Sequence, residues 1–287
     1  MIELKCGEAR ASLSRLGAEV RSWSVAGRDL LWTPEPAIWN AVSPLLFPVV
    51  GWTRLSRVSV GGAFYPMPVH GFAASSIFSL ELIDPSHARF TLRDNAQTRA
   101  HYPFAFELRI DYRLSEDAMC VECRVRNTSS EPLPYSVGLH PGFVWPFCGG
   151  DFSDYRIVFD QPEAPGVPII AAGGLISRAS RVLAMNGREL ALSLELFTQD
   201  ALCFLNAKSR KLIFERPGFG AIEISGEGFP HWALWSKMGA NFLSVEAWSG
   251  HGDPEDFAGE LREKPSITLL AQCCENIHRA CFQFRSS

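Results

Sequence analysis

The chain has 287 residues, of which 47 % are hydrophobic and 20 % are charged, and its formal net charge is −4. This composition is close to the average of soluble globular proteins and excludes an intrinsically disordered chain, which would be poor in apolar residues. No run of Lys or Arg gives the basic footprint of a protein that binds nucleic acid or an acidic membrane surface, so we expect neither partner.

The N-terminal part of the chain alternates short apolar runs with turn residues. Residues 18–32 predict two short strands joined by a turn at residues 26–29. Residues 57–67 predict a hairpin whose turn is formed by Gly61 and Gly62. At the very start, residues 1–6 are not followed by the long apolar stretch of a secretory signal peptide, so we expect no such signal.

The clearest strand is predicted over residues 104–114, where every second residue is apolar. A turn at 115–118 leads into a second alternating run that contains Val121, Cys123 and Val125. Further strand candidates are residues 156–159, 191–196, 201–205, 211–214, 221–225, 242–247 and 266–273. Many short strands without alternating helices predict an all-β protein built as a large antiparallel β-sandwich or barrel.

Two segments are predicted to be surface loops. Residues 161–174 are rich in Pro, Gly and Ala, and residues 253–264 are charged and contain Pro and Gly, which favours a solvated loop with one helical turn. We find no internal repeat, no break in composition and no apolar stretch of about 18 residues that could span a membrane. The sequence therefore predicts one β domain over residues 1–287.

The eight cysteines are scattered along the chain. Cys120 and Cys123 have the spacing of a redox or zinc motif, but neither a second such pair nor a nearby histidine completes a site. They lie in an alternating run, where cysteine acts as a small apolar residue. We therefore expect reduced, structural thiols in a cytoplasmic protein, and no metal site.

Three ionisable residues have unusual local settings. His70 follows a hairpin strand and precedes Gly71, and His140 ends an apolar run just before Pro141. Strand ends are where a rigid scaffold presents functional side chains. Glu246 lies in an apolar strand, where burying a carboxylate without partners is costly. Taken singly, each histidine is also compatible with a structural role, and Glu246 with an outward-facing strand position.

Seven short stretches occur together and in order, and with them the chain resembles the aldose 1-epimerase (galactose mutarotase-like) family, in its shorter bacterial branch. They are GAEV at 17–20, PLLFPVVG at 44–51, HGFA at 70–73, YPF at 102–104, GLHPGF at 138–143, DAL at 200–202 and LSVEAW at 243–248. The resemblance covers nearly the full chain. It implies a large antiparallel sandwich with an open carbohydrate cleft, and interconversion of the α and β anomers of a free aldose without metal or cofactor.

The resemblance also implies roles for single residues. Glu246 matches the general base, His140 the general acid that protonates the ring oxygen, and His70 the second histidine that holds and polarises the sugar. Asp200 matches an aspartate that binds sugar hydroxyls, and it is equally compatible with a turn residue that caps a strand. A positioned acid and a positioned base each contribute about 10²–10⁴-fold to such a reaction.

The chain departs from the family pattern at two positions. The family often has an arginine directly after Gly51, where this chain has Trp52, and we expect Arg54 to reach the same place or to be an ordinary exposed arginine. After HGFA, Ala74 stands where relatives often carry an arginine. Trp52 offers an apolar ring face for sugar stacking. For Trp52, as for Trp145 and Trp248, burial in the core is the alternative.

Three functions therefore compete at this point. The first is a mutarotase acting on a free aldose. The second is an epimerase of a phosphorylated sugar, which requires a cationic cleft, with Arg54, Arg57 and Lys237 as candidates. The third is a carbohydrate-binding module without turnover on the same fold. A glycoside hydrolase lacks support, because only Glu246 has a suitable context and a paired carboxylate is required. Neither the sugar nor the oligomeric state follows from the sequence.

Overall fold

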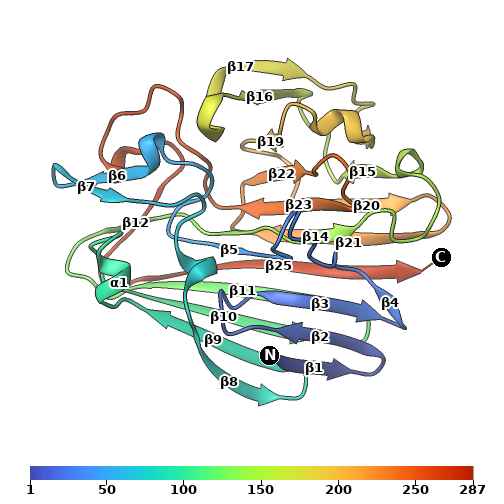
Figure 1. The fold of residues 1–287 in the computed structure, drawn as a ribbon, viewed down its shortest axis with the longest axis horizontal. Helices are drawn as coiled ribbons and strands as arrows, with labels where there is room; N and C mark the ends of the chain where they lie inside the picture. The colour runs from blue at the N-terminus through green and yellow to red at the C-terminus, as the bar shows by residue number, and fades with distance from the viewer. Residues whose placement is uncertain (287) are drawn as a thin grey trace.

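A computed structural model describes residues 1–286, whose regular secondary structure consists mainly of antiparallel strands (Figure 1). The largest sheet has nine strands in the order β18-β15-β20-β21-β25-β11-β10-β9-β8. Their bounds are β18 (Glu189–Ala191), β15 (Arg156–Phe159), β20 (Lys211–Arg216), β21 (Gly220–Glu227), β25 (Glu275–Ser286), β11 (Ala118–Asn127), β10 (Phe106–Leu114), β9 (His87–Arg93) and β8 (Ser79–Asp84). The predicted all-β, antiparallel fold class is confirmed.

A second sheet has six strands, five of them in the order β19-β22-β23-β13-β5, with β14 also paired to β23. Their bounds are β19 (Leu202–Phe204), β22 (His231–Trp235), β23 (Phe242–Trp248), β13 (Gly138–Leu139), β5 (Leu45–Leu46) and β14 (Gly142–Val144). The N-terminal strands form a four-stranded sheet of β1 (Ile2–Cys6), β2 (Ala9–Leu13), β3 (Val20–Val25) and β4 (Arg28–Asp29).

Three strand pairs stand apart from these sheets: β6 (Arg57–Val60) with β7 (Ala63–Pro66), β12 (Leu133–Tyr135) with β24 (Thr268–Leu270), and β16 (Gly166–Ile170) with β17 (Ile176–Val182). Helical structure is limited to α1 (Ala96–Arg99) and the 3₁₀ turns η1 (Arg54–Ser56), η2 (Ala73–Ser75), η3 (Phe152–Asp154), η4 (Ala172–Gly174), η5 (Leu194–Phe197) and η6 (Leu261–Glu263). Within residues 1–286, no helix has the length and apolar content needed to cross a membrane.

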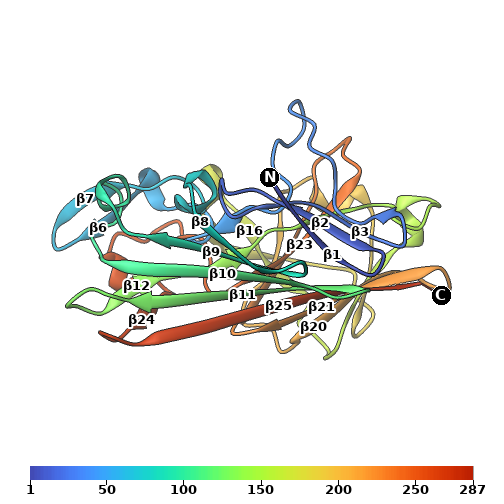
Figure 2. The same ribbon diagram turned by 90° about the horizontal axis from the view of Figure 1, so that it is seen from below.

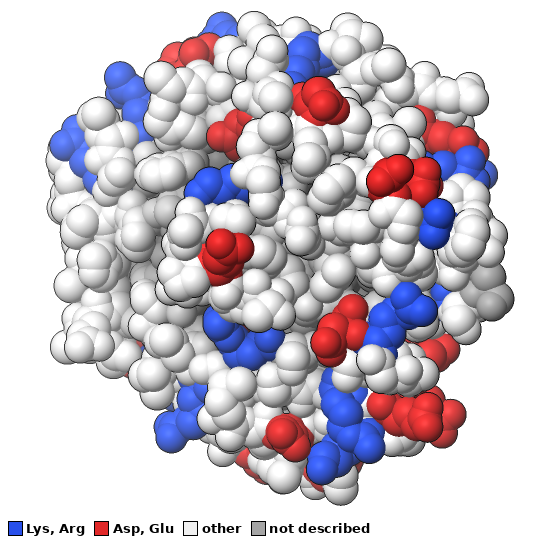
Figure 3. Space-filling view, turned by 45° about the vertical axis from the view of Figure 1, so that its right-hand side comes forward, with Lys and Arg blue, Asp and Glu red and all other residues white. Residues whose placement is uncertain are grey.

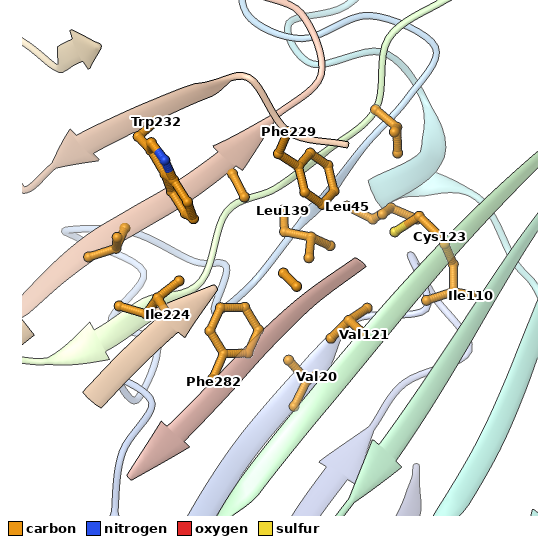
Figure 4. Close-up of a cluster of buried hydrophobic side chains, with 14 of the residues drawn as sticks. Val20, Leu45, Ile110, Val121, Cys123, Leu139, Ile224, Phe229, Trp232 and Phe282 are labelled. Carbon is orange, nitrogen blue, oxygen red and sulfur yellow. The ribbon is translucent and has the colours of Figure 1, made fainter. Parts of the chain in front are cut away.

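The sheets are stacked, and the apolar core lies between them. Figure 2 shows β1 to β3 lying over the nine-stranded sheet, and the Tyr112 hydroxyl joins the two layers by donating to the Ala18 carbonyl at 2.7 Å. Val20 of β3, Val121 of β11 and Phe282 of β25 are all buried in the space between the layers (Figure 4). On the face drawn in Figure 3, Lys and Arg are interspersed with Asp and Glu, and no broad basic patch is visible.

Several local predictions are confirmed and others are wrong. The hairpin at 57–67, the long strand over 104–114 and the strand at 156–159 are present. The predicted loop at 161–174 instead contains β16 and η4, and it belongs to a hairpin. In the predicted strand at 191–196, only Ala191 is extended, in β18, and residues 194–196 belong to the 3₁₀ turn η5. In the predicted strand 266–273, only β24 is extended.

Some strands had no clear signal in the sequence. β22 is buried on both faces, so its residues do not alternate between apolar and polar. β25 has twelve residues and pairs with both β11 and β21, so the C-terminal segment lies inside the nine-stranded sheet. Its charged residues lie on the solvent side and weaken the apolar pattern.

The prediction that all cysteines are reduced is wrong for two of them. Cys120 and Cys281 are register partners on β11 and β25, and a disulfide joins them. The pairing brings together residues separated by 161 positions in the sequence, which the spacing Cys120–Cys123 could not indicate. Cys123 is a free, buried thiol that faces the core, as expected for an alternating strand. The free cysteines are Cys6, Cys123, Cys148, Cys203, Cys273 and Cys274.

This disulfide makes a simple prediction. In denaturant, the unreduced protein will titrate six thiols, and two more will appear after reduction. Because the bridge closes a long loop in the unfolded chain, Cys281→Ser will lower the free energy of unfolding by about 2–5 kcal/mol, as measured by urea denaturation. Eight free thiols before reduction would contradict the assignment.

Candidate active site

A cavity of about 310 Å³ opens over the six-stranded sheet and gathers five of the six site residues predicted from the sequence. Its volume is within the range of small-molecule sites. The lining includes five ionisable side chains, His70, His140, Asp200, Cys203 and Glu246. It also includes four tryptophans, Trp39, Trp52, Trp235 and Trp248.

Glu246 lies near the end of β23, a strand in which every residue is buried. Its side chain faces the cavity, so it does not point outward to solvent. The Trp248 indole N–H donates to its Oε2 at 2.9 Å. Burial raises the pKa of Glu246 well above the usual value, the charge of Asp200 adds to this rise, and the Trp248 hydrogen bond opposes it. The carboxyl therefore has a high affinity for a proton.

His140 lies between β13 and β14, next to Glu246. Its Nε2 is 3.3 Å from Glu246 Oε1. Two indole rings pack against the imidazole, with ring centroids at 5.1 Å for Trp39 and 5.6 Å for Trp235. Burial lowers the pKa of His140 well below 6.5, and the neighbouring His70 adds to the effect. Both shifts disfavour the charged forms, so a neutral imidazole beside a protonated carboxyl is favoured.

His70 is held by reciprocal hydrogen bonds to Gly51. The His70 backbone N–H donates to the Gly51 carbonyl at 2.9 Å, and the Gly51 N–H donates to His70 Nδ1 at 3.1 Å. Because Nδ1 accepts, the neutral ring carries its proton on Nε2. His70 has a left-handed backbone with φ of 63°, and its ring centroid is 5.5 Å from that of His140. Burial lowers its pKa to about 4, so His70 stays a neutral donor near pH 7.

Asp200 fits both interpretations given by the sequence. It lies two residues before the start of β19, has a left-handed φ of 70° and accepts a hydrogen bond from the Ala201 N–H at 2.7 Å. It also lines the cavity. Arg181 of β17 donates to the Asp200 carbonyl at 3.2 Å, so this turn is tied to the hairpin β16–β17.

Trp52 lies between the sheet and the hairpin β16–β17, which forms one wall of the cavity through Ile170, Gly174 and Ile176. Trp52 is 42 % exposed, so part of the residue is accessible to solvent. Gly174 approaches the indole so closely that a Cβ at this position would overlap it. The hairpin at 161–182, predicted in part to be a loop, thus shapes the cavity.

Arg54 is not brought into this cavity. It lines a separate cavity of about 200 Å³, together with Arg57 and Lys264, and its backbone N–H donates to Asp253 Oδ2 at 2.8 Å. Lys264 and Asp253 form a buried ion pair inside the segment predicted to be a solvated loop.

Two other candidates from the sequence are also placed. Lys237 donates to the backbone carbonyl of Ile38 at 2.6 Å and does not line the cavity. Trp145 is buried in the core against Phe152 and Phe197, as its core alternative predicted. Among the described residues that line the cavity there is no Lys or Arg.

Sequence reasoning did not identify Trp39, Trp235 or Cys203 as part of the site. Trp39 comes from an irregular segment, which carries no periodic signal. Trp235 and Cys203 reach the cavity because β19, β22 and β23 are in register, with Cys203 opposite Ala233 and Ala233 opposite Glu246. Only the strand pairing reveals this row. In residues 1–286, no group of three or more His, Cys, Asp or Glu side chains is arranged to hold a metal ion.

The contact between Gly174 and Trp52 can be tested with its neighbour as the control. Gly173 and Gly174 have left-handed φ angles of 76° and 75°, but only Gly174 meets a side chain. Alanine at either position will cost about 1–2 kcal/mol of stability from the backbone. Gly174→Ala alone will displace Trp52, which acrylamide quenching of tryptophan fluorescence will detect, with Trp52→Phe as the reference. Equal quenching in both alanine variants would contradict the contact.

The sequence and the fold are similar to those of known proteins. A family model described as aldose 1-epimerase matches residues 1–163. The protein LacX of Lactococcus lactis subsp. lactis, in plasmid and chromosomal versions, is 29 % identical over 281 residues, which cover 94 % of this chain and 94 % of the relative.

Solved structures have the same fold. A galactose mutarotase related enzyme from Lactobacillus acidophilus has a TM-score of 0.92 at 26 % identity, covering 99 % of this chain and 97 % of the other. A galactose mutarotase-like protein from Lactobacillus casei ATCC 334 also has a TM-score of 0.92, at 24 % identity, covering 99 % of this chain and 100 % of the other. The aldose 1-epimerase family model matches more than half of this chain, so the chain belongs to that family.

Proposed function

We propose that this protein is a mutarotase that interconverts the α and β anomers of a free aldose. The observation that carries the proposal is the pair of His140 Nε2 and Glu246 Oε1, 3.3 Å apart in a cavity large enough for a sugar. Mutarotation needs one group that accepts a proton and one that donates a proton on either side of a hemiacetal. The family to which the chain belongs supports this choice.

The pair supplies both proton transfers of ring opening. When the proton of the pair passes from Glu246 to His140 Nε2, Glu246 is ionised and accepts the proton of the anomeric hydroxyl, while His140 Nε2 gives its proton to the ring oxygen. The C1–O5 bond breaks and an aldehyde forms. Rotation about C1–C2 exposes the other carbonyl face, and ring closure returns both protons. The pair holds one proton before and after each step, so the reaction requires neither metal nor cofactor.

The other cavity residues bind and orient the sugar in this proposal. His70, a neutral Nε2–H donor, polarises the ring or carbonyl oxygen, and Asp200 accepts hydrogen bonds from sugar hydroxyls. The partly exposed Trp52 is suited to packing against the apolar face of a pyranose. Trp39 and Trp235 line the same cavity and keep water away from the acid–base pair.

The alternatives receive less support. A phosphorylated sugar would bring a charged group into a cavity whose described lining contains no Lys or Arg and includes Asp200 and Glu246. Arg54 and Arg57, the candidate cations, line another cavity. A binding module without turnover would have no use for an acid and a base in direct contact.

One prediction concerns the acid–base pair of His140 and Glu246. Glu246→Gln removes the proton acceptor at almost constant shape, and His140→Ala removes the donor, so each will lower kcat by about 10²–10⁴-fold. Polarimetry of freshly dissolved sugar measures the rate. Glu215→Gln is the control, because Glu215 pairs with Arg156 on the nine-stranded sheet, outside the cavity.

Circular dichroism will show whether the variants keep the fold. Wild-type rates in a folded Glu246→Gln or His140→Ala protein would end the assigned roles. Saturable sugar binding by the wild-type protein without any acceleration would instead establish the binding module.

A second prediction concerns the charge of the substrate. Exchange NMR of anomers across free aldoses and their phosphorylated counterparts will show acceleration for free sugars. The kcat/KM of phosphorylated ones will be lower by at least about tenfold, because an unpaired phosphate must lose water without a counter-charge. Acceleration confined to phosphorylated sugars would replace the proposal with the phosphosugar alternative.

A further inference from the structure

Ser244 makes two hydrogen bonds in the space behind His140. Its Oγ is 2.9 Å from the Pro141 carbonyl oxygen and 2.9 Å from His140 Nδ1. Ser244 is fully buried, so no solvent molecule replaces either partner. It does not line the cavity, so its effect on a bound sugar must pass through His140.

Only one assignment of donors and acceptors satisfies both hydrogen bonds of Ser244. A hydroxyl has one proton to donate, and a carbonyl oxygen can only accept. The Ser244 hydroxyl therefore donates to the Pro141 carbonyl, and its lone pair accepts from His140 Nδ1–H. The neutral form of His140 consequently carries its proton on Nδ1, and its Nε2, the atom that faces Glu246, has a free lone pair.

We propose that Ser244 is a positioning residue for the acid, because it fixes His140 in the Nδ1–H form and so reserves Nε2 for the proton shared with Glu246. This inference rests on the proposed mutarotation. An imidazolium that gives up its Nε2 proton while Nδ1–H is held becomes a neutral ring. A neutral ring with its only proton on Nε2 would become an imidazolate on donation, which is far less stable.

His70 and His140 are therefore held in opposite tautomers of the neutral ring. Gly51 donates to His70 Nδ1, so the His70 proton is on Nε2, whereas Ser244 accepts from His140 Nδ1. His70 can only donate to the sugar, while His140 can both take up and release a proton at Nε2. A backbone donor at His70 and a side-chain acceptor at His140 therefore give the same side chain two functions.

Strand β23 carries both Glu246 and Ser244, the residue that positions His140. Ser244 and Glu246 are two residues apart, so they lie on the same face of the strand. Ser244 is opposite Gly142 of β14, directly after the segment His140-Pro141. The pairing of β14 with β23 thus places the Pro141 carbonyl and the His140 ring against one hydroxyl.

NMR of ¹⁵N-histidine-labelled protein tests the form of the ring directly. Near neutral pH, the expected spectrum of wild-type protein shows a protonated Nδ1 for His140 and a protonated Nε2 for His70. In Ser244→Ala, His140 will gain Nε2–H character and His70 will not change. A wild-type His140 with its proton on Nε2, or a Ser244→Ala spectrum identical to that of the wild type, would overturn the inference.

Kinetics tests the consequence for catalysis. Ser244→Ala will lower kcat by about 10–100-fold with little change in KM, since the sugar contacts remain. Ser244→Thr keeps the hydroxyl and will restore most of kcat and the wild-type ring form. Ser236→Ala is the matched control, because Ser236 is equally buried and donates only to the Phe242 carbonyl at 2.8 Å.

An equal loss of kcat in Ser236→Ala and Ser244→Ala would show that any lost buried hydrogen bond has this effect, and the inference would fail. The two proposals are also separable. If the wild-type protein does not accelerate mutarotation but His140 carries Nδ1–H only when Ser244 is present, the proposed function fails and the positioning role of Ser244 stands.

Discussion

The burial of Glu246 is the constraint on which the rest of the site depends. A carboxyl group without solvent needs partners for its oxygens, and here each oxygen has one: Oε2 accepts from the Trp248 indole, and Oε1 faces His140 Nε2. Those partners account for the position of His140, and Ser244 accounts for its orientation. Burial also raises the affinity of the Glu246 carboxyl for a proton.

Sheet register turns this local constraint into a cavity. Glu246 is opposite Ala233, which is opposite Cys203, so a single row across β23, β22 and β19 carries the reacting group and the floor beside it. His70 comes from a distant loop, which is fixed by the reciprocal hydrogen bonds with Gly51 and by an isolated β-bridge between Phe47 and Gly71. Packed strands position His140 and Glu246, and a separate loop positions His70.

The sequence was informative where the physics is local or the motif is dense. Alternation predicted the strand at 104–114, and the residue stretches around His70, His140 and Glu246 pointed to one site, where the structure brings them together. Cross-strand partners were invisible, which is why the Cys120–Cys281 bridge was missed. Trp235 was missed because β22 does not alternate. Arg54 illustrates the opposite error: two residues beyond Trp52, the chain already turns into another cavity.

Two kinds of structure form the cavity: buried strands, and turns beside a hairpin. The two groups that we propose move protons are on or beside β23, in the most buried part of the six-stranded sheet, where small displacements are resisted by packing. The groups proposed to bind the sugar's periphery, Trp52 and Asp200, lie on turns and against the hairpin β16–β17. Changes in that hairpin can alter which sugar fits without moving His140 relative to Glu246. A scaffold of this kind keeps one reaction while its recognition surface varies, because the chemistry and the recognition rest on different hydrogen bonds.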